Sequence, residues 1–181
     1  MSRKVVFIIL TCLLFIVGCN SYSKYDDKEV AAIVRGEEIT IGELRFLYPD
    51  EKIVDYLDGT IKARLAVQEA KKLNLDVSQE LQEVQEIVIE NSTYPFNEDN
   101  HESGNDFREF VDTQSKKLEM DPEEYYDRYF EITQETSIYL VAYLEELLGE
   151  PKMNVDYDAQ ANELLNDLVK ENEKEIQILI K

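Results

Sequence analysis

The side chains best suited to covalent or acid–base chemistry are scarce in this sequence of 181 residues. It contains two cysteines, Cys12 and Cys19, and one histidine, His101. A nucleophilic enzyme needs a serine or cysteine with a base beside it, and a zinc site needs several thiolate or imidazole ligands. Carboxylates are the opposite case, because 39 Asp and Glu residues make any choice of a catalytic pair arbitrary. We therefore expect neither an enzyme nor a cofactor-dependent protein.

One acidic stretch imitates the start of a calcium-binding loop. Asp99, His101, Ser103 and Gly104 stand at positions that an EF-hand loop would use. The twelfth position of such a loop requires a bidentate glutamate, and here it falls on Phe110. The stretch is therefore interpreted as a turn-rich loop, and no metal site is predicted.

The N-terminal segment has the layout of a signal peptide. Arg3 and Lys4 precede an apolar run of 13 residues, Val5 to Val17, which is too short for a spanning helix. The residues that end the run, Ile16-Val17-Gly18-Cys19, resemble the lipobox of bacterial lipoproteins. This resemblance implies cleavage before Cys19 and a lipid, including palmitate, on that cysteine. The alternative is an ordinary signal peptide that happens to contain a cysteine.

The domain boundaries follow from this interpretation. Residues 1–18 are the predicted lipoprotein signal peptide, residues 19–28 a lipidated, flexible tether, and residues 29–181 a single helical domain. The lipid anchor would hold the domain at the cell membrane, facing the outside of the cytoplasm. The acidic, lysine-containing character of the chain suits the surface of a Gram-positive bacterium.

The predicted fold is mainly α, because 6 Gly and 4 Pro are too few turn residues for a sandwich or barrel. An apolar run at Val30–Val34, a turn at Arg35-Gly36 and an extended stretch at 37–39 predict a small N-terminal β-hairpin. About five to six helices are expected to follow. The first helix should start at Thr40. The next helices should cover about 52–73, 79–90, a range that includes 107–118, and 122–148. The last helix should run from about 156 to the final residue. Charged residues at 170–175 interrupt the last helix, so its end is expected to project.

The helix expected over 122–148 carries aromatic side chains that could bind another polypeptide. Tyr125, Tyr129, Tyr139 and Tyr143 are the candidate peptide-binding residues, because tyrosine supplies amphipathic contact area at low entropic cost. The alternative is that these rings pack in the core. Helical spacing alone does not decide which of them face outward.

Two segments near the N-terminus carry a family resemblance. The run VAAIVRGEEITIGELRF begins at Val30, and IKARLAVQEAKKLNLDVSQEL begins at Ile61. In order and spacing they resemble the N-terminal region of SurA-like and PrsA-like extracytoplasmic foldases, with Arg35 replacing the common asparagine and Asn74 the common glycine. The resemblance implies a SurA N-terminal or trigger-factor-like architecture, in which helices cradle non-native exported polypeptides.

Many members of that family contain a parvulin prolyl isomerase domain before the final helix. Here only six residues, 150–155, separate the last two predicted helices, and the sole histidine is His101. The chain is therefore interpreted as a membrane-tethered, chaperone-like lipoprotein without prolyl isomerase activity. The alternative is a structural or interaction lipoprotein that uses the same helical scaffold and is not a chaperone.

The charge balance indicates which partners to expect. With 19 Lys and Arg against 39 Asp and Glu, the net charge is −20, which argues against a nucleic-acid partner. The expected partners are unfolded or exported polypeptides, together with the membrane through the N-terminal lipid. Basic segments should be favoured, because the acidic body attracts them and speeds their encounter.

Overall fold

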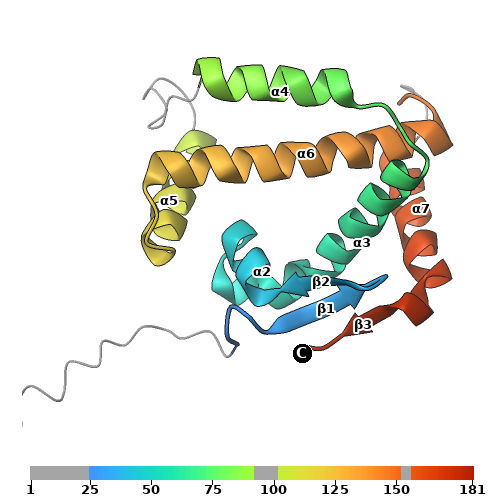
Figure 1. Cartoon of the computed structure of the whole chain (residues 1–181), viewed down its shortest axis with the longest axis horizontal. Coiled ribbons are helices and arrows are strands. Elements are labelled where there is room, and N and C mark those ends of the chain that lie inside the picture. The colour runs from blue at the N-terminus through green and yellow to red at the C-terminus, as the bar shows by residue number, and fades with distance from the viewer. Residues whose placement is uncertain (1–24, 92–101, 152–155) are drawn as a thin grey trace, which may run out of the picture.

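The computed structural model describes residues 25–91, 102–151 and 156–181. This part of the chain is mainly helical and contains one small antiparallel sheet, as predicted (Figure 1). Its elements, in chain order, are β1 (Val30–Val34), β2 (Glu37–Thr40), α2 (Ile41–Leu47), the 3-10 turn η1 (Asp50–Lys52), α3 (Ile53–Lys72), α4 (Ser78–Asn91), α5 (Glu102–Lys117), α6 (Pro122–Leu148), α7 (Tyr157–Glu171), the 3-10 turn η2 (Glu173–Glu175) and β3 (Ile176–Ile178).

The predicted N-terminal hairpin is confirmed. Strands β1 and β2 pair with Val34 opposite Glu37, and the two residues between them, Arg35 and Gly36, have φ angles of 50° and 83°. A two-residue turn with both φ angles positive matches the twist of an antiparallel pair. Arg35 tolerates this backbone because its side chain is held on both sides, by an ion pair to Glu69 at 2.6 Å and a hydrogen bond to the Asn172 Oδ1 atom at 2.7 Å.

The prediction of a last helix that runs to the end of the chain and projects is wrong. Helix α7 stops at Glu171, and the chain returns to the sheet as β3, which pairs with β1 so that Ala32 lies opposite Ile178. Asn172 ends the helix, since its Nδ2 atom donates to the Leu168 carbonyl at 2.7 Å. Ile176 packs against the core and Ile180 is buried in it, whereas Ile178 between them is 60% exposed.

Local capping signals set most of the helix boundaries. The Thr40–Glu43 capping box is present, with Thr40 Oγ1 accepting from the Glu43 N–H at 3.1 Å and the Thr40 N–H donating to the Glu43 carboxylate at 2.9 Å. Asp121 caps α6, and Gly149 ends it with a φ of 76°. At the start of α4, the Asp76 carboxylate accepts from both the N–H and the hydroxyl of Ser78.

Helix α3 lies at the centre of the main core. Its buried stripe follows a spacing of four residues from Ile53 through Leu57 to Leu65, so Val54, which is off this stripe, is 48% exposed. Figure 1 shows α6 crossing over α3, with α4 running beside α6, α5 near its N-terminal end and α7 near its C-terminal end. The main core consists of Ala31, Ala32, Val34, Ile39, Ile41, Leu44, Ile53, Leu57, Ile61, Leu65, Ala66, Ala70, Tyr143, Leu168 and Ile180.

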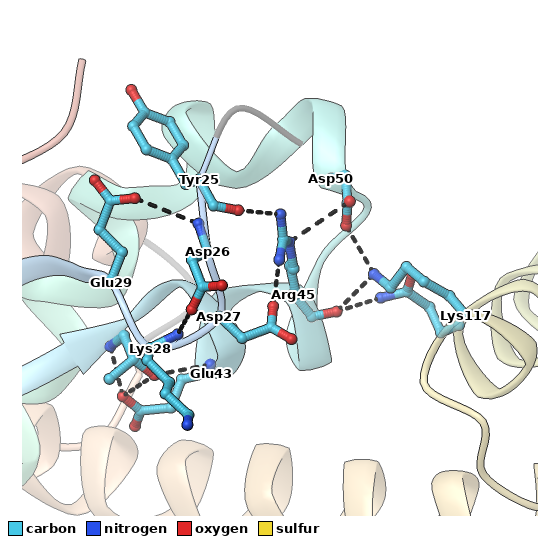
Figure 2. A network of polar contacts seen from close by, with 11 residues as sticks. Tyr25, Asp26, Asp27, Lys28, Glu29, Glu43, Arg45, Asp50 and Lys117 are labelled. Carbon is cyan, nitrogen blue, oxygen red and sulfur yellow. Dashed lines mark hydrogen bonds and ion pairs between the residues drawn. The ribbon is translucent and has the colours of Figure 1, made fainter. Parts of the chain in front are cut away.

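Residues 25–28, which the sequence assigns to a flexible tether, are attached to the folded body (Figure 2). Arg45 of α2 pairs with the Asp27 carboxylate and donates to the Tyr25 carbonyl at 2.6 Å. The Tyr25 hydroxyl donates to the backbone carbonyl of Lys181 at 2.6 Å, next to β3. The Arg45 carbonyl in turn accepts from Lys117 of α5 at 2.9 Å. This polar network joins residues 25–28 to α2 and α5. Sequence patterns within one element do not reveal such contacts.

Candidate functional site

A groove of about 470 Å³ lies between β2, α2, α3 and α6. This volume falls within the range typical of ligand-binding pockets. The surface of the groove is mainly apolar, although half of the side chains that line it are polar or charged. The lining residues are Glu37, Ile39, Gly42, Glu43, Leu44, Phe46, Leu47, Tyr48, Thr60, Ala63, Arg64, Val67, Gln68, Lys71, Arg128, Ile132, Glu135 and Thr136.

One face of α6 forms a wall of this groove. Arg128, Ile132 and Thr136 follow one another at intervals of four residues, and Glu135 lies on the same side of the helix. The facing walls come from α2 and from the middle of α3, where Ala63 and Val67 supply small apolar side chains. The groove therefore exists because α6 crosses the body formed by the sheet, α2 and α3.

The N-terminal part of α6 rests on α2 through Tyr125. This side chain is completely buried, and its hydroxyl donates to the Phe46 carbonyl at 2.8 Å, while the two rings lie 5.0 Å apart. Burial, and next the neighbouring Tyr129, raise the pKa of the Tyr125 hydroxyl well above its usual value. The hydroxyl is therefore a neutral, fixed hydrogen-bond donor, and Tyr125 has a packing role.

Tyr129 belongs to an aromatic cluster rather than to the groove. Its ring lies 5.9 Å from Phe107 and 5.5 Å from Phe110, both on α5, and 5.9 Å from Tyr125. We call these four rings, together with Phe46, the aromatic cluster. Burial raises the pKa of Tyr129, and the proximity of Tyr48 adds to this effect. The cluster attaches α5 to the N-terminal part of α6.

The C-terminal part of α6 enters the main core. Tyr143 is 5% exposed, and burial, followed by the nearby Glu69 and Glu171 carboxylates, raises the pKa of its hydroxyl. Tyr139 is half-buried against the same core, and the ammonium group of Lys71 lies 4.7 Å from its ring centroid. None of the four candidate tyrosines is among the described residues that line the groove. For Tyr125 and Tyr143, burial corrects their assignment as a client-binding wall.

The groove residues that the analysis of the sequence missed are mainly Phe46, Tyr48, Val67 and Ile132. All four are half-buried. Arg128, Ile132 and Thr136 lie on one face of α6, but they carry a cation, an apolar side chain and a hydroxyl group. No amphipathic pattern in the sequence therefore marks this face. Only the crossing of α6 over α2 and α3 brings these side chains together.

Ion pairs neutralise most of the charges on the groove. Arg64 contacts Glu43 at 2.9 Å and Glu37 at 3.4 Å, and Lys71 contacts Glu135 at 3.6 Å. Arg128 lies instead over the ring of Phe46, with its guanidinium carbon 5.2 Å from the ring centroid. The groove thus has an apolar lining and balanced charges, although the whole chain carries a net charge of −20.

Most of the remaining predictions about sites concern residues outside the described part of the chain, but Ser103 and Gly104 of the predicted loop lie in the first turn of α5. Cys12, Cys19 and His101 all lie outside the described residues. Within residues 25–91, 102–151 and 156–181, no cluster of three His, Cys, Asp or Glu side chains is arranged to hold a metal ion. Across the same residues, no helix has both the length and the apolar character that crossing a membrane requires.

Comparison with protein-family models, with curated proteins and with solved structures found no match.

Proposed function

We propose that this protein is a lipid-anchored, chaperone-like protein that binds non-native segments of exported polypeptides in the groove between α2, α3 and α6. The observation that carries this proposal is the apolar lining of a groove of about 470 Å³ bounded by two helices and a hairpin–helix unit. An apolar side chain that enters such a groove leaves water, and this transfer is favourable whatever the detailed sequence of the segment.

The composition of the groove supports binding rather than catalysis. Among the described residues that line it there is neither cysteine nor histidine, and its carboxylates Glu37, Glu43 and Glu135 all contact cations. A nucleophile with an adjacent base is the usual requirement for covalent catalysis. The proposal therefore includes no enzymatic step and no prolyl isomerase activity. In a prolyl isomerisation assay, proline-containing test peptides should isomerise at the same rate with and without the protein.

The location is part of the same proposal. The lipobox-like residues that end at Cys19 would place the protein at the membrane surface, where exported chains emerge unfolded. Cys19→Ser should prevent lipid attachment, because a hydroxyl cannot replace the thiol in thioether formation. Labelling of cells with palmitate should mark the wild-type protein and leave the variant unlabelled. Equal labelling of both would contradict the lipid anchor.

Suppression of aggregation tests the binding function. A reduced, unfolded model protein should aggregate more slowly when this protein is present in several-fold molar excess. Ile132→Glu places a charge in the groove and should abolish this protection. Val141→Glu makes a comparable change on the same helix at a position that is 45% exposed and outside the groove, and should preserve it.

Thermal unfolding of both variants separates a blocked groove from a damaged fold. When the aggregation assay is run well below the Tm of Ile132→Glu, the folded variant should still fail to suppress aggregation. If the wild-type protein gives no protection at any excess, the chaperone proposal fails. A single defined partner that binds without affinity for unfolded chains would then favour the structural or interaction lipoprotein.

A further inference from the structure

The six charged side chains of the groove differ in how they are paired. Five of them form ion pairs with one another: Arg64 with Glu37 and Glu43, and Lys71 with Glu135. The sixth is Arg128, which has no carboxylate oxygen within 4.0 Å among the described residues. The chain has about twice as many acidic as basic residues. Among the described residues, Arg128 nevertheless differs from Arg64 and Lys71, the other two cations of the groove, because no carboxylate pairs with it.

The position of Arg128 is defined by its contact with Phe46. Its guanidinium carbon lies 5.2 Å from the Phe46 ring centroid, and Phe46 is held in turn by Tyr125, whose ring is 5.0 Å away. The positive group is attracted by the face of the aromatic ring. The side chain of Arg128 is exposed, so its N–H groups remain accessible to a ligand in the groove.

A guanidinium group has a specific chemical preference. Its planar set of N–H donors matches a carboxylate, which it can bind through two parallel hydrogen bonds. Next to Arg128, Phe46 and Ile132 supply apolar surface in the same groove. We infer that the groove prefers polypeptide segments in which apolar side chains are flanked by a carboxylate, with Arg128 binding that carboxylate. This inference rests on the proposed function and specifies the segments that the groove takes.

The inference opposes the preference expected from overall charge. A net charge of −20 favours the approach of basic segments. That long-range attraction is screened beyond about 8 Å at physiological ionic strength, whereas a direct contact in a partly enclosed groove is screened less. At such salt concentrations the local contact with Arg128 should decide the equilibrium preference, and the overall charge should act mainly on the association rate.

Three labelled peptides test the inference with the full chain. They share a Leu-Phe-Leu core and carry Glu, Gln or Lys on both sides of it. Fluorescence anisotropy at roughly physiological salt should give the Glu peptide a Kd about two- to fivefold lower than that of the Gln peptide, the size expected for one exposed ion pair. Arg128→Gln should remove this difference, and Arg128→Lys should restore part of it.

Lys116→Gln is the matched control, since it removes one exposed positive charge from α5 outside the groove and should leave the preference unchanged. Equal binding of the Glu and Gln peptides by the wild-type protein, or tighter binding of the Lys peptide, would overturn the inference and leave the chaperone proposal standing. The same holds if Arg128→Gln keeps the preference with an unchanged Tm. If none of the three peptides binds, the proposed function fails, and this inference fails with it.

Discussion

The two halves of α6 use the same residue type in different ways. In the C-terminal half, Tyr143 is packed in the main core with residues from the sheet, α3 and α7. In the N-terminal half, Tyr125 and Tyr129 belong to the aromatic cluster that joins α6 to α2 and α5. The groove lies between these two attachments. Helix α6 is therefore packed against other elements near both of its ends. The role of each tyrosine depends on the element that lies opposite it.

This difference predicts unequal energetic consequences along one helix. The main core draws on residues that are far apart in the sequence, so damage there should weaken the whole domain. The aromatic cluster involves only α2, α5 and α6, which are fewer elements than the main core contains. Damage there should therefore loosen mainly the wall of the groove. Substitutions on the main-core side, at Tyr143, Arg35 and Glu69, and in the aromatic cluster, at Tyr125, should therefore differ in which part of the domain they weaken.

Tyr143→Ala should have the largest effect. Removing a nearly fully buried aromatic ring leaves a cavity, and such changes typically cost about 3–5 kcal/mol. Urea unfolding followed by circular dichroism should show a lower midpoint for the whole domain in one transition. Tyr143→Phe keeps the ring and serves as the control. A loss below about 1 kcal/mol for Tyr143→Ala would contradict the assignment of this tyrosine to the core.

Arg35→Asn should have the next largest effect. Asparagine tolerates the positive φ of this turn, so the change mainly removes the contacts of the arginine with Glu69 and Asn172. We expect a loss of about 1–2 kcal/mol, because both side chains of the ion pair are mostly buried. Thermal unfolding measures it. An equal or higher Tm would show that the turn, and not the link to α3 and α7, limits stability.

Tyr125→Phe should cost less in stability but should act on the groove. The change leaves the Phe46 carbonyl without its hydrogen bond, at a cost of about 1 kcal/mol. Amide hydrogen exchange should quicken in α2 and in the N-terminal half of α6 more than in α3. Uniformly faster exchange across all helices would contradict the separation of the two halves of α6.

The smallest effect should be a pH dependence centred on Glu69. Burial opposes ionisation of this carboxyl, but hydrogen bonds from Arg35 and Lys72 outweigh it and lower the pKa of Glu69 below its ordinary value of 4.5. The unfolded chain then binds the proton more tightly than the folded one. The stabilisation is therefore present above pH 4.5 and is lost as pH falls through the lower, folded pKa.

Glu69→Gln provides the measurement for this prediction. The wild-type protein should have the higher Tm at about pH 7, and the difference between the two proteins should shrink as the pH is lowered to about 3. A Tm difference that stays constant, or that grows with acid, would show that the Arg35–Glu69 contact contributes through packing and not through charge.

Much of the secondary structure could be predicted because its signals are local. Thr40 and Glu43 are three residues apart, Asp121 directly precedes the proline that opens α6, and Gly149 directly follows its last residue. Each of these signals acts through hydrogen bonds or backbone angles within one turn of helix. The hairpin was predictable for the same reason, since its two strands are joined by two residues.

The candidate site was less predictable, and the missed features share a cause. Strand β3 pairs with β1 across more than 140 residues of sequence, from Ala32 to Ile178. The attachment of Tyr25 to Lys181 spans 156 positions. The groove combines side chains from α2, α3 and α6, and its α6 wall has no amphipathic pattern of its own. The prediction of a tyrosine wall rested on helical spacing, which does not reveal that other elements cover Tyr125 and Tyr143.

The sequence by itself determined where the hairpin and most of the helices lie, although not the C-terminal end of α7, and its lipobox-like residues motivate the proposed location. It did so because capping, turn geometry and helical periodicity act over a few residues. Only the tertiary structure decided which tyrosines are buried, that the C-terminal segment becomes a strand, and that Arg128, with no carboxylate oxygen within 4.0 Å among the described residues, stands at the groove. These features depend on contacts between elements distant in sequence, such as β3 with β1 and α6 with α2 and α3, which result from the summed packing of their side chains.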